Sequence, residues 1–161
     1  MAEQKLTIEE QIKTRLSGDL QKNTLEFAAY LKSNDVSPES VYSCGFDYLG
    51  ERVCILFVED NGSLYVYFNG KFIHEPKSLQ VSTHLKEFAH ANVNYCSYLG
   101  IDGKNCDCGG RPGSSITIYG KIFDYVCHAP LVFFNPNSET YEKIKELVSI
   151  WKHNIDEMKK I

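Results

Sequence analysis

Residues 51–68 read ERVCILFVEDNGSLYVYF, and this stretch decides the fold class. On either side of Asn61-Gly62, side chains alternate with a period of two, which indicates two strands joined by a tight turn. Working outward, further turn pairs stand at Gly50-Glu51 and Asn69-Gly70, and the same periodicity begins near Val41. The sequence therefore predicts an antiparallel meander in the middle of the chain.

Helical patterns flank this meander on both sides. Thr7 and Glu10 form a capping-box pair at the start of the first pattern, and Trp151 lies on the apolar stripe of the last one. Helices at both ends and strands between them are typical of an α+β fold with an antiparallel sheet of about six to eight strands. Four helices are predicted: residues 7–16, residues 20–33, a short middle helix from about Ser82, and a C-terminal helix over residues 138–158.

Composition limits the class of protein. The 161 residues are 43% hydrophobic and contain no linker-like segment, which favours a single domain over residues 1–161. With 17 basic against 21 acidic residues, we expect no nucleic-acid partner. The chain shows no export signal and no apolar run long enough for a bilayer, so we expect a cytoplasmic protein without a membrane. The expected partner is a small molecule or another protein.

A two-residue turn at Gly50-Glu51 would set the register of the first hairpin. It pairs Tyr48 with Val53, so Cys54 points away from the apolar layer and cannot form a disulfide with Cys44. The residues predicted to share the apolar face are Cys44, Phe46, Tyr48, Val53, Ile55 and Phe57.

Four of the six cysteines, Cys96, Cys106, Cys108 and Cys127, lie within residues 96–127. A second hairpin turn at Gly120-Lys121 would place Ser114 opposite Cys127, at the base of the hairpin. If a strand over residues 95–99 pairs at the same end, Cys96 arrives there too. The four thiolates then form a candidate structural zinc site, since zinc favours tetrahedral sulfur coordination.

The spacing of these cysteines leaves other interpretations open. Strong zinc signatures carry two Cys-x-x-Cys pairs, and this chain has one Cys-x-Cys pair with two separate cysteines. Ordinary thiols are one alternative. Another is a thiol redox protein that uses Cys106 and Cys108, whose disulfide would be strained and easily reduced. His128 follows Cys127, and neighbours on a strand are expected to point to opposite faces.

Tyr65 and Tyr67 must occupy the sheet face opposite Leu64, Val66 and Phe68. We expect the two tyrosines to pack under a helix, and the alternative is a surface that lines a ligand pocket of a small-molecule enzyme. The sequence assigns no catalytic residue, and enzymatic activity stays open. The leading expectation is a small binding or regulatory module with a structural zinc site.

Overall fold

The computed structural model describes residues 4–96 and 113–160 and has the expected α+β architecture. Seven strands form one antiparallel sheet in the order β1-β2-β3-β4-β7-β5, and β6 also pairs with β7. The strands are β1 (Ser37–Pro38), β2 (Gly45–Tyr48), β3 (Glu51–Val58), β4 (Leu64–Phe68), β5 (Val93–Tyr95), β6 (Ser114–Ile118) and β7 (Lys121–Phe134). The helices are α1 (Ile8–Arg15), α2 (Gly18–Ser33), the 3-10 helix η1 (Gly70–Phe72), α3 (Thr83–Ala91) and α4 (Ser138–Lys159).

The predicted α-helices are confirmed, and side-chain caps mark several of their starts. The Thr7 amide donates to Glu10 Oε2 at 2.7 Å, while the Glu10 amide donates to Thr7 Oγ1 at 3.2 Å. Ser82 caps α3 and Asn137 caps α4, so α1, α3 and α4 begin where a side-chain oxygen accepts from an orphan amide, whereas Ser17 makes no such bond at the start of α2. None of the helices in residues 4–96 and 113–160 is both long and apolar enough to span a membrane.

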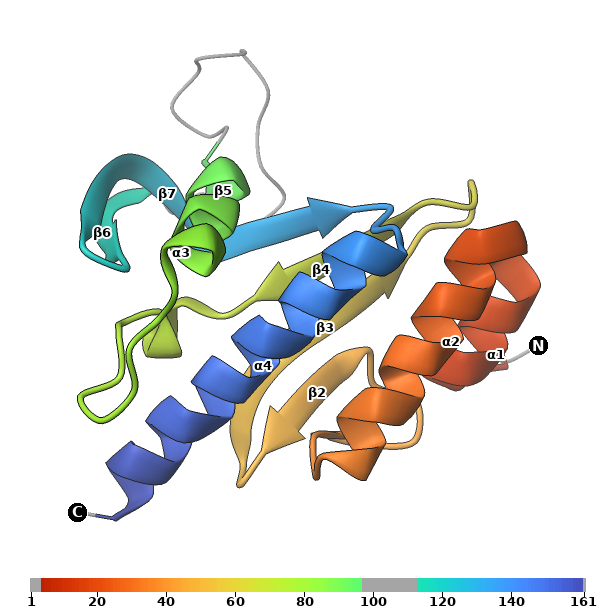
Figure 1. Ribbon diagram of the computed structural model, residues 1–161. Coiled ribbons are helices and arrows are strands. Elements are labelled where there is room, and N and C mark those ends of the chain that lie inside the picture. The colour runs from red at the N-terminus through yellow and green to blue at the C-terminus, as the bar shows by residue number, and fades with distance from the viewer. Residues whose placement is uncertain (1–3, 97–112, 161) are drawn as a thin grey trace.

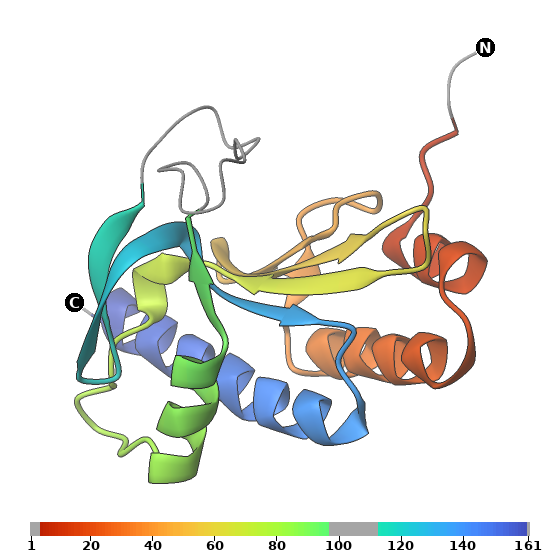
Figure 2. The same cartoon turned by 90° about the horizontal axis from the view of Figure 1, so that it is seen from above.

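Helices α2, α3 and α4 lie on one side of the sheet, and α1 lies beside the end of β3 (Figures 1 and 2). Trp151 of α4 is fully buried, with its ring centroid 5.0 Å from that of Phe68. Its indole N–H donates to the carbonyl of Asn69 at 3.1 Å. The sheet residues buried on this helix-covered side are Phe46, Cys54, Leu56, Val58, Leu64, Val66, Phe68, Leu131 and Phe133.

The β2–β3 hairpin differs from the predicted register. Its turn residues are Leu49 and Gly50, with φ of 50° and 80°, and Tyr48 pairs with Glu51. Both central residues are left-handed, as a type I′ turn requires, and glycine takes the second central position where the prediction had the first. A bulge at Val53 shifts the ladder again, since Phe46 pairs with Cys54 and Asp47 with Arg52. The predicted shared face was therefore wrong.

The β6–β7 hairpin departs from its predicted register for the same reason. Tyr119 and Gly120 form the turn with φ of 45° and 86°, and Ile118 pairs with Lys121. Ser114 faces Val126, so its predicted pairing with Cys127 was wrong. In addition, β7 continues to Phe134 as one long strand, whose first half pairs with β6 and whose last residues pair with β4.

The pair Asn69-Gly70 does not form a hairpin turn. Asn69 Oδ1 accepts the Lys71 amide at 3.0 Å and caps η1, after which the chain leaves the sheet. The neighbour of β4 is instead β7, which returns from the far end of the sequence. A single Asn-Gly pair thus marks either a hairpin or a helix start, and the following residues decide between them.

Candidate functional site

Side chains of β3, β4 and β7 form two rows on the side of the sheet that faces away from the helices. The cross-strand pairing places Phe57, Tyr65 and Phe134 in one row, and Ile55, Tyr67 and Val132 in the other. We call these six residues the open aromatic face. Phe57 is 48% exposed and Phe134 is 57% exposed. Among the elements that the structure describes, no helix lies over these rows (Figure 2).

The aromatic rings of this face contact one another. Tyr65 and Tyr67 have ring centroids 5.8 Å apart, and Tyr65 and Phe134 have centroids 5.0 Å apart. The predicted alternation along β4 is confirmed, because Leu64, Val66 and Phe68 are buried while the tyrosines are half-buried on the other side. The favoured expectation that a helix packs on the tyrosines was wrong for the described elements: α2, α3 and α4 lie across the sheet from them, and α1 lies at its side.

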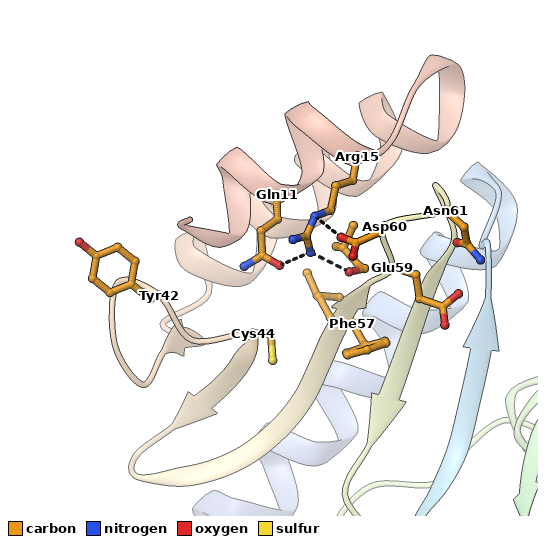
Figure 3. A pocket seen from close by; sticks show the side chains of 10 residues that line it. Gln11, Arg15, Tyr42, Cys44, Phe57, Glu59, Asp60 and Asn61 are labelled. Atoms are coloured by element: carbon orange, nitrogen blue, oxygen red, sulfur yellow. Dashed lines mark hydrogen bonds and ion pairs between the residues drawn. The ribbon is translucent and has the colours of Figure 1, made fainter. Parts of the chain in front are cut away.

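A groove of about 550 Å³ opens beside this face, between α1 and the end of β3 (Figure 3). Phe57 belongs to both features, so the groove is continuous with the open aromatic face. Tyr42 and Cys44, which precede β2, line the other wall. Tyr42 is 53% exposed, which adds another aromatic ring at the mouth of the groove.

Arg15 crosses the inner end of this groove and ties α1 to the β3–β4 turn. Its guanidinium lies 3.3 Å from Gln11 Oε1 and 3.2 Å from the Val58 carbonyl oxygen, and Nε lies 3.1 Å from Asp60 Oδ1 (Figure 3). Glu59, which also lines the groove, has no ion pair among the described residues. The accessible charge at this wall is therefore negative.

A second ion cluster lies at the β2 side of the sheet. Arg52 pairs with Asp47 and with Glu39, the latter at 3.1 Å. A Cβ at Gly45 would lie 2.1 Å from the Arg52 guanidinium, so a larger residue there would displace this side chain. As with Arg15, the cation is engaged by carboxylates, and the cluster as a whole carries one negative charge.

The predicted cysteine cluster lies only partly within the described residues. Cys106 and Cys108 fall outside them. Cys96 is buried just after β5, and its amide donates to the Tyr125 carbonyl at 2.6 Å. Cys127 is half-buried on β7, two residues beyond Tyr125. Within residues 4–96 and 113–160, no three His, Cys, Asp or Glu side chains are grouped so that they could hold a metal ion.

Cys127 and His128 were expected on opposite faces of their strand, and this expectation was wrong. Cys127 Sγ lies 3.6 Å from His128 Nδ1. The strict alternation fails here because residues 127–130 bulge out of the ladder with β5: Val126 pairs with Tyr95 and Leu131 with Val93. The two side chains thus form an exposed thiol–imidazole contact.

Cys44 and Cys54 exchange the environments predicted for them. Cys54 is fully buried among the apolar residues under the helices, and burial raises the pKa of its thiol. Cys44 is half-buried and lines the groove. The bulge at Val53 accounts for the changed side of Cys54, because it shifts the alternation of β3 by one residue relative to β2.

Ser78, His153 and Glu157 come together between the loop after η1 and α4, which no spacing in the sequence indicates. Ser78 Oγ hydrogen-bonds to Glu157 Oε1 and lies 2.7 Å from His153 Nε2. The same imidazole nitrogen lies 3.3 Å from Glu157 Oε1. A catalytic relay requires the two ring nitrogens to serve different partners, so this set anchors the loop and is not a nucleophile with its base.

Residues of α1, β3 and the loop before β2, far apart in sequence, build the groove, which is why local patterns did not reveal it. Alternation along β4 was the one local signal for the open aromatic face. No sequence pattern indicated that Tyr42 would line the groove. A comparison with protein-family models finds no match, and comparisons with curated proteins and with solved structures find no significant similarity.

Proposed function

We propose that this protein is a binding module that holds a polypeptide segment of a partner on its open aromatic face. The observation that carries the proposal is the pair of apolar rows across β3, β4 and β7 without a covering helix among the described elements. Phe57 and Phe134 are exposed and the other four residues are half-buried. Grouped exposed apolar side chains of this kind mark interaction sites. Aromatic side chains supply large contact area at small entropic cost, which suits them to such a site.

The charges around the face favour a cationic segment. Arg15 and Arg52 are each engaged by carboxylates, whereas Glu59 is unpaired among the described residues and the Asp60 side chain is 91% exposed. A Lys or Arg of the partner would meet a negative rim there, which raises association rates and excludes acidic partners. The adjoining groove of about 550 Å³ is large enough for several side chains of the same segment.

A phage-displayed library of random 16-residue peptides tests the proposal directly. We expect selected peptides to combine aromatic or aliphatic residues with Lys or Arg. The double variant Phe57→Ser/Phe134→Ser should bind them at least about 10-fold more weakly, since each exposed ring contributes on the order of 1 kcal/mol or more to such contacts.

The matched control is Leu79→Ser/Ile122→Ser, which removes two apolar side chains that are 41% and 70% exposed away from this face. The control should bind the selected peptides as the natural chain does. The proposal fails if selection enriches no peptide, if the enriched peptides are acidic, or if the control loses as much affinity as the face variant.

The structural zinc site stays a second proposal, and one feature of the described residues favours it. A Cβ built on Gly113 would lie 2.6 Å from the Cys96 Cβ, so the chain on either side of residues 97–112 meets beside β7, the strand that carries Cys127. Cys108 is five residues before Gly113, a span of at most about 18 Å. This length of chain allows Cys106 and Cys108 to approach Cys96, which supports a shared zinc site.

Metal analysis of protein purified without added metal or chelator tests this second proposal. We expect about one zinc per chain, and its loss in Cys108→Ser, because structural zinc requires all four ligands. Cys44→Ser removes a groove thiol and should retain the metal. Absence of zinc together with rapid modification of Cys106 and Cys108 would favour the thiol redox alternative.

A further inference from the structure

A second cleft, separate from the open aromatic face, lies between the loop after η1 and the last turns of α4. Its volume is about 580 Å³, which is in the range of small-molecule sites. Phe72 and Met158 supply apolar walls, and Asn154 also lines it. Lys71, Lys77 and Lys160 stand at its rim. The cleft therefore combines an apolar interior with a basic edge.

Asn154 is a buried polar residue with an unused acceptor. Its side chain is only 1% exposed, and Nδ2 donates to the carbonyls of Phe72 and His74, each at 2.8 Å. These two bonds fix the orientation of the amide group. Oδ1 is buried and accepts no hydrogen bond within the part of the chain that the structure describes. A buried acceptor without a donor is costly. Because Asn154 lines the cleft, a ligand donor that displaces the cleft wall slightly would satisfy Oδ1.

Positive charges at the rim of the cleft outnumber the negative charges near it. Lys71 is paired with Glu51 at 2.9 Å, whereas Lys77 and Lys160 have no ion pair among the described residues. Glu157 also lines the cleft, but the amides of Lys77 and Ser78 and the Ser78 hydroxyl occupy its carboxylate. In a chain with a net charge of −4, this local excess favours an anionic ligand group.

We propose that this cleft binds a small amphipathic carboxylate that carries an N–H group beside the carboxylate, of the N-acyl amino acid class. The acyl chain packs on Phe72 and Met158, the N–H donates to Asn154 Oδ1, and the carboxylate lies against Lys77 and Lys160. The acyl chain, the N–H group and the carboxylate thus match the apolar walls, the unpaired acceptor and the basic rim of the cleft. The site is independent of the peptide-binding face and does not require it.

Titration of the isotope-labelled full chain with N-octanoylglycine, followed by NMR, tests this site. We expect shifts of the Asn154 side-chain amide and the Met158 methyl group. Octanoate, which lacks the N–H, and N-octanoylglycinamide, which lacks the charge, should each bind about 10-fold more weakly, as for the loss of one hydrogen bond to a buried or charged group.

The variant Lys77→Ala/Lys160→Ala should also weaken binding of N-octanoylglycine about 10-fold, because both cations face the carboxylate. Lys13→Ala/Lys22→Ala changes the net charge equally on the exposed sides of α1 and α2 and should bind as the natural chain does. The proposal is overturned if N-octanoylglycine shifts only the tyrosines of the open aromatic face or binds nowhere at millimolar concentration. Equal affinities for the three ligands would overturn it as well, since Asn154 would then be satisfied by water alone.

Discussion

The hydroxyl groups of Thr24 on α2 and Tyr141 on α4 lie 2.8 Å apart in the core. Thr24 Oγ1 also lies 2.6 Å from the Leu20 carbonyl oxygen, so the threonine donates there and accepts from the tyrosine. Both side chains are buried, and burial raises the pKa of Tyr141. This buried hydrogen bond thus links the two long helices that cover the sheet.

Tyr141→Phe should lower the free energy of unfolding by about 1 kcal/mol, because Thr24 keeps an unused acceptor in the core. Urea unfolding followed by circular dichroism measures the change. Adding Thr24→Val should cost less than the sum of the two single changes, since both polar groups are then gone. Strictly additive effects would show that the two hydroxyls do not interact.

Leu49→Asn should stabilise the protein by about 0.5–1 kcal/mol, because Asn accepts the left-handed conformation of the first type I′ position far better than leucine does. Leu49 has a φ of 50° and its side chain is 55% exposed, so little packing is lost. The melting temperature should rise accordingly. Leu79→Asn removes another exposed leucine outside the hairpin turns and should give no such gain; a gain there or none at Leu49 would contradict this reasoning.

The order of elements was predictable from sequence, whereas strand register was not. Helix starts are local, since Thr7 and Glu10 satisfy each other's amides within one turn. Register depends on which residue beside a glycine takes positive φ, and Leu49 and Tyr119 are unusual there. The bulge at Val53 places Cys54 on the buried side of the sheet, under the helices. This placement depends on tertiary packing, which no local sequence pattern indicates.

The candidate sites were still less predictable. Tyr65 and Tyr67 were located on the correct face by alternation, but whether a helix covers that face depends on how long-range connections run. The cleft near Asn154 needs contacts to Phe72 and His74, about eighty positions away in the chain. Such juxtaposition arises from tertiary packing alone.

Native-state alkylation should label Cys44 and spare Cys54, with rates that differ by about 100-fold or more, because only the buried thiol requires opening of the core. Cys44 lines the groove, whereas Cys54 is fully buried and its thiol pKa is raised. Peptide mapping by mass spectrometry after brief exposure to iodoacetamide separates the two sites. The register predicted from sequence buries Cys44 and exposes Cys54, so it gives the opposite order of labelling. Labelling of Cys54 before Cys44 would therefore favour that register.

Glu157→Gln should destabilise the protein at neutral pH and lose this effect in acid. The hydrogen bond from Ser78, with the backbone amides and His153, lowers the pKa of Glu157 below its ordinary value of 4.5. A carboxyl whose pKa is depressed on folding contributes stability above its unfolded pKa, and that contribution disappears as pH falls through the folded pKa. Urea midpoints of the natural chain and the variant should therefore differ at pH 7 and converge as pH falls below 4.5 and then through the lowered pKa of folded Glu157. Glu146→Gln, on an exposed α4 position without a hydrogen bond or ion pair among the described residues, controls for the change in net charge. A difference that persists unchanged in acid would show that the shape of the Glu157 side chain, and not its charge, holds the loop on α4.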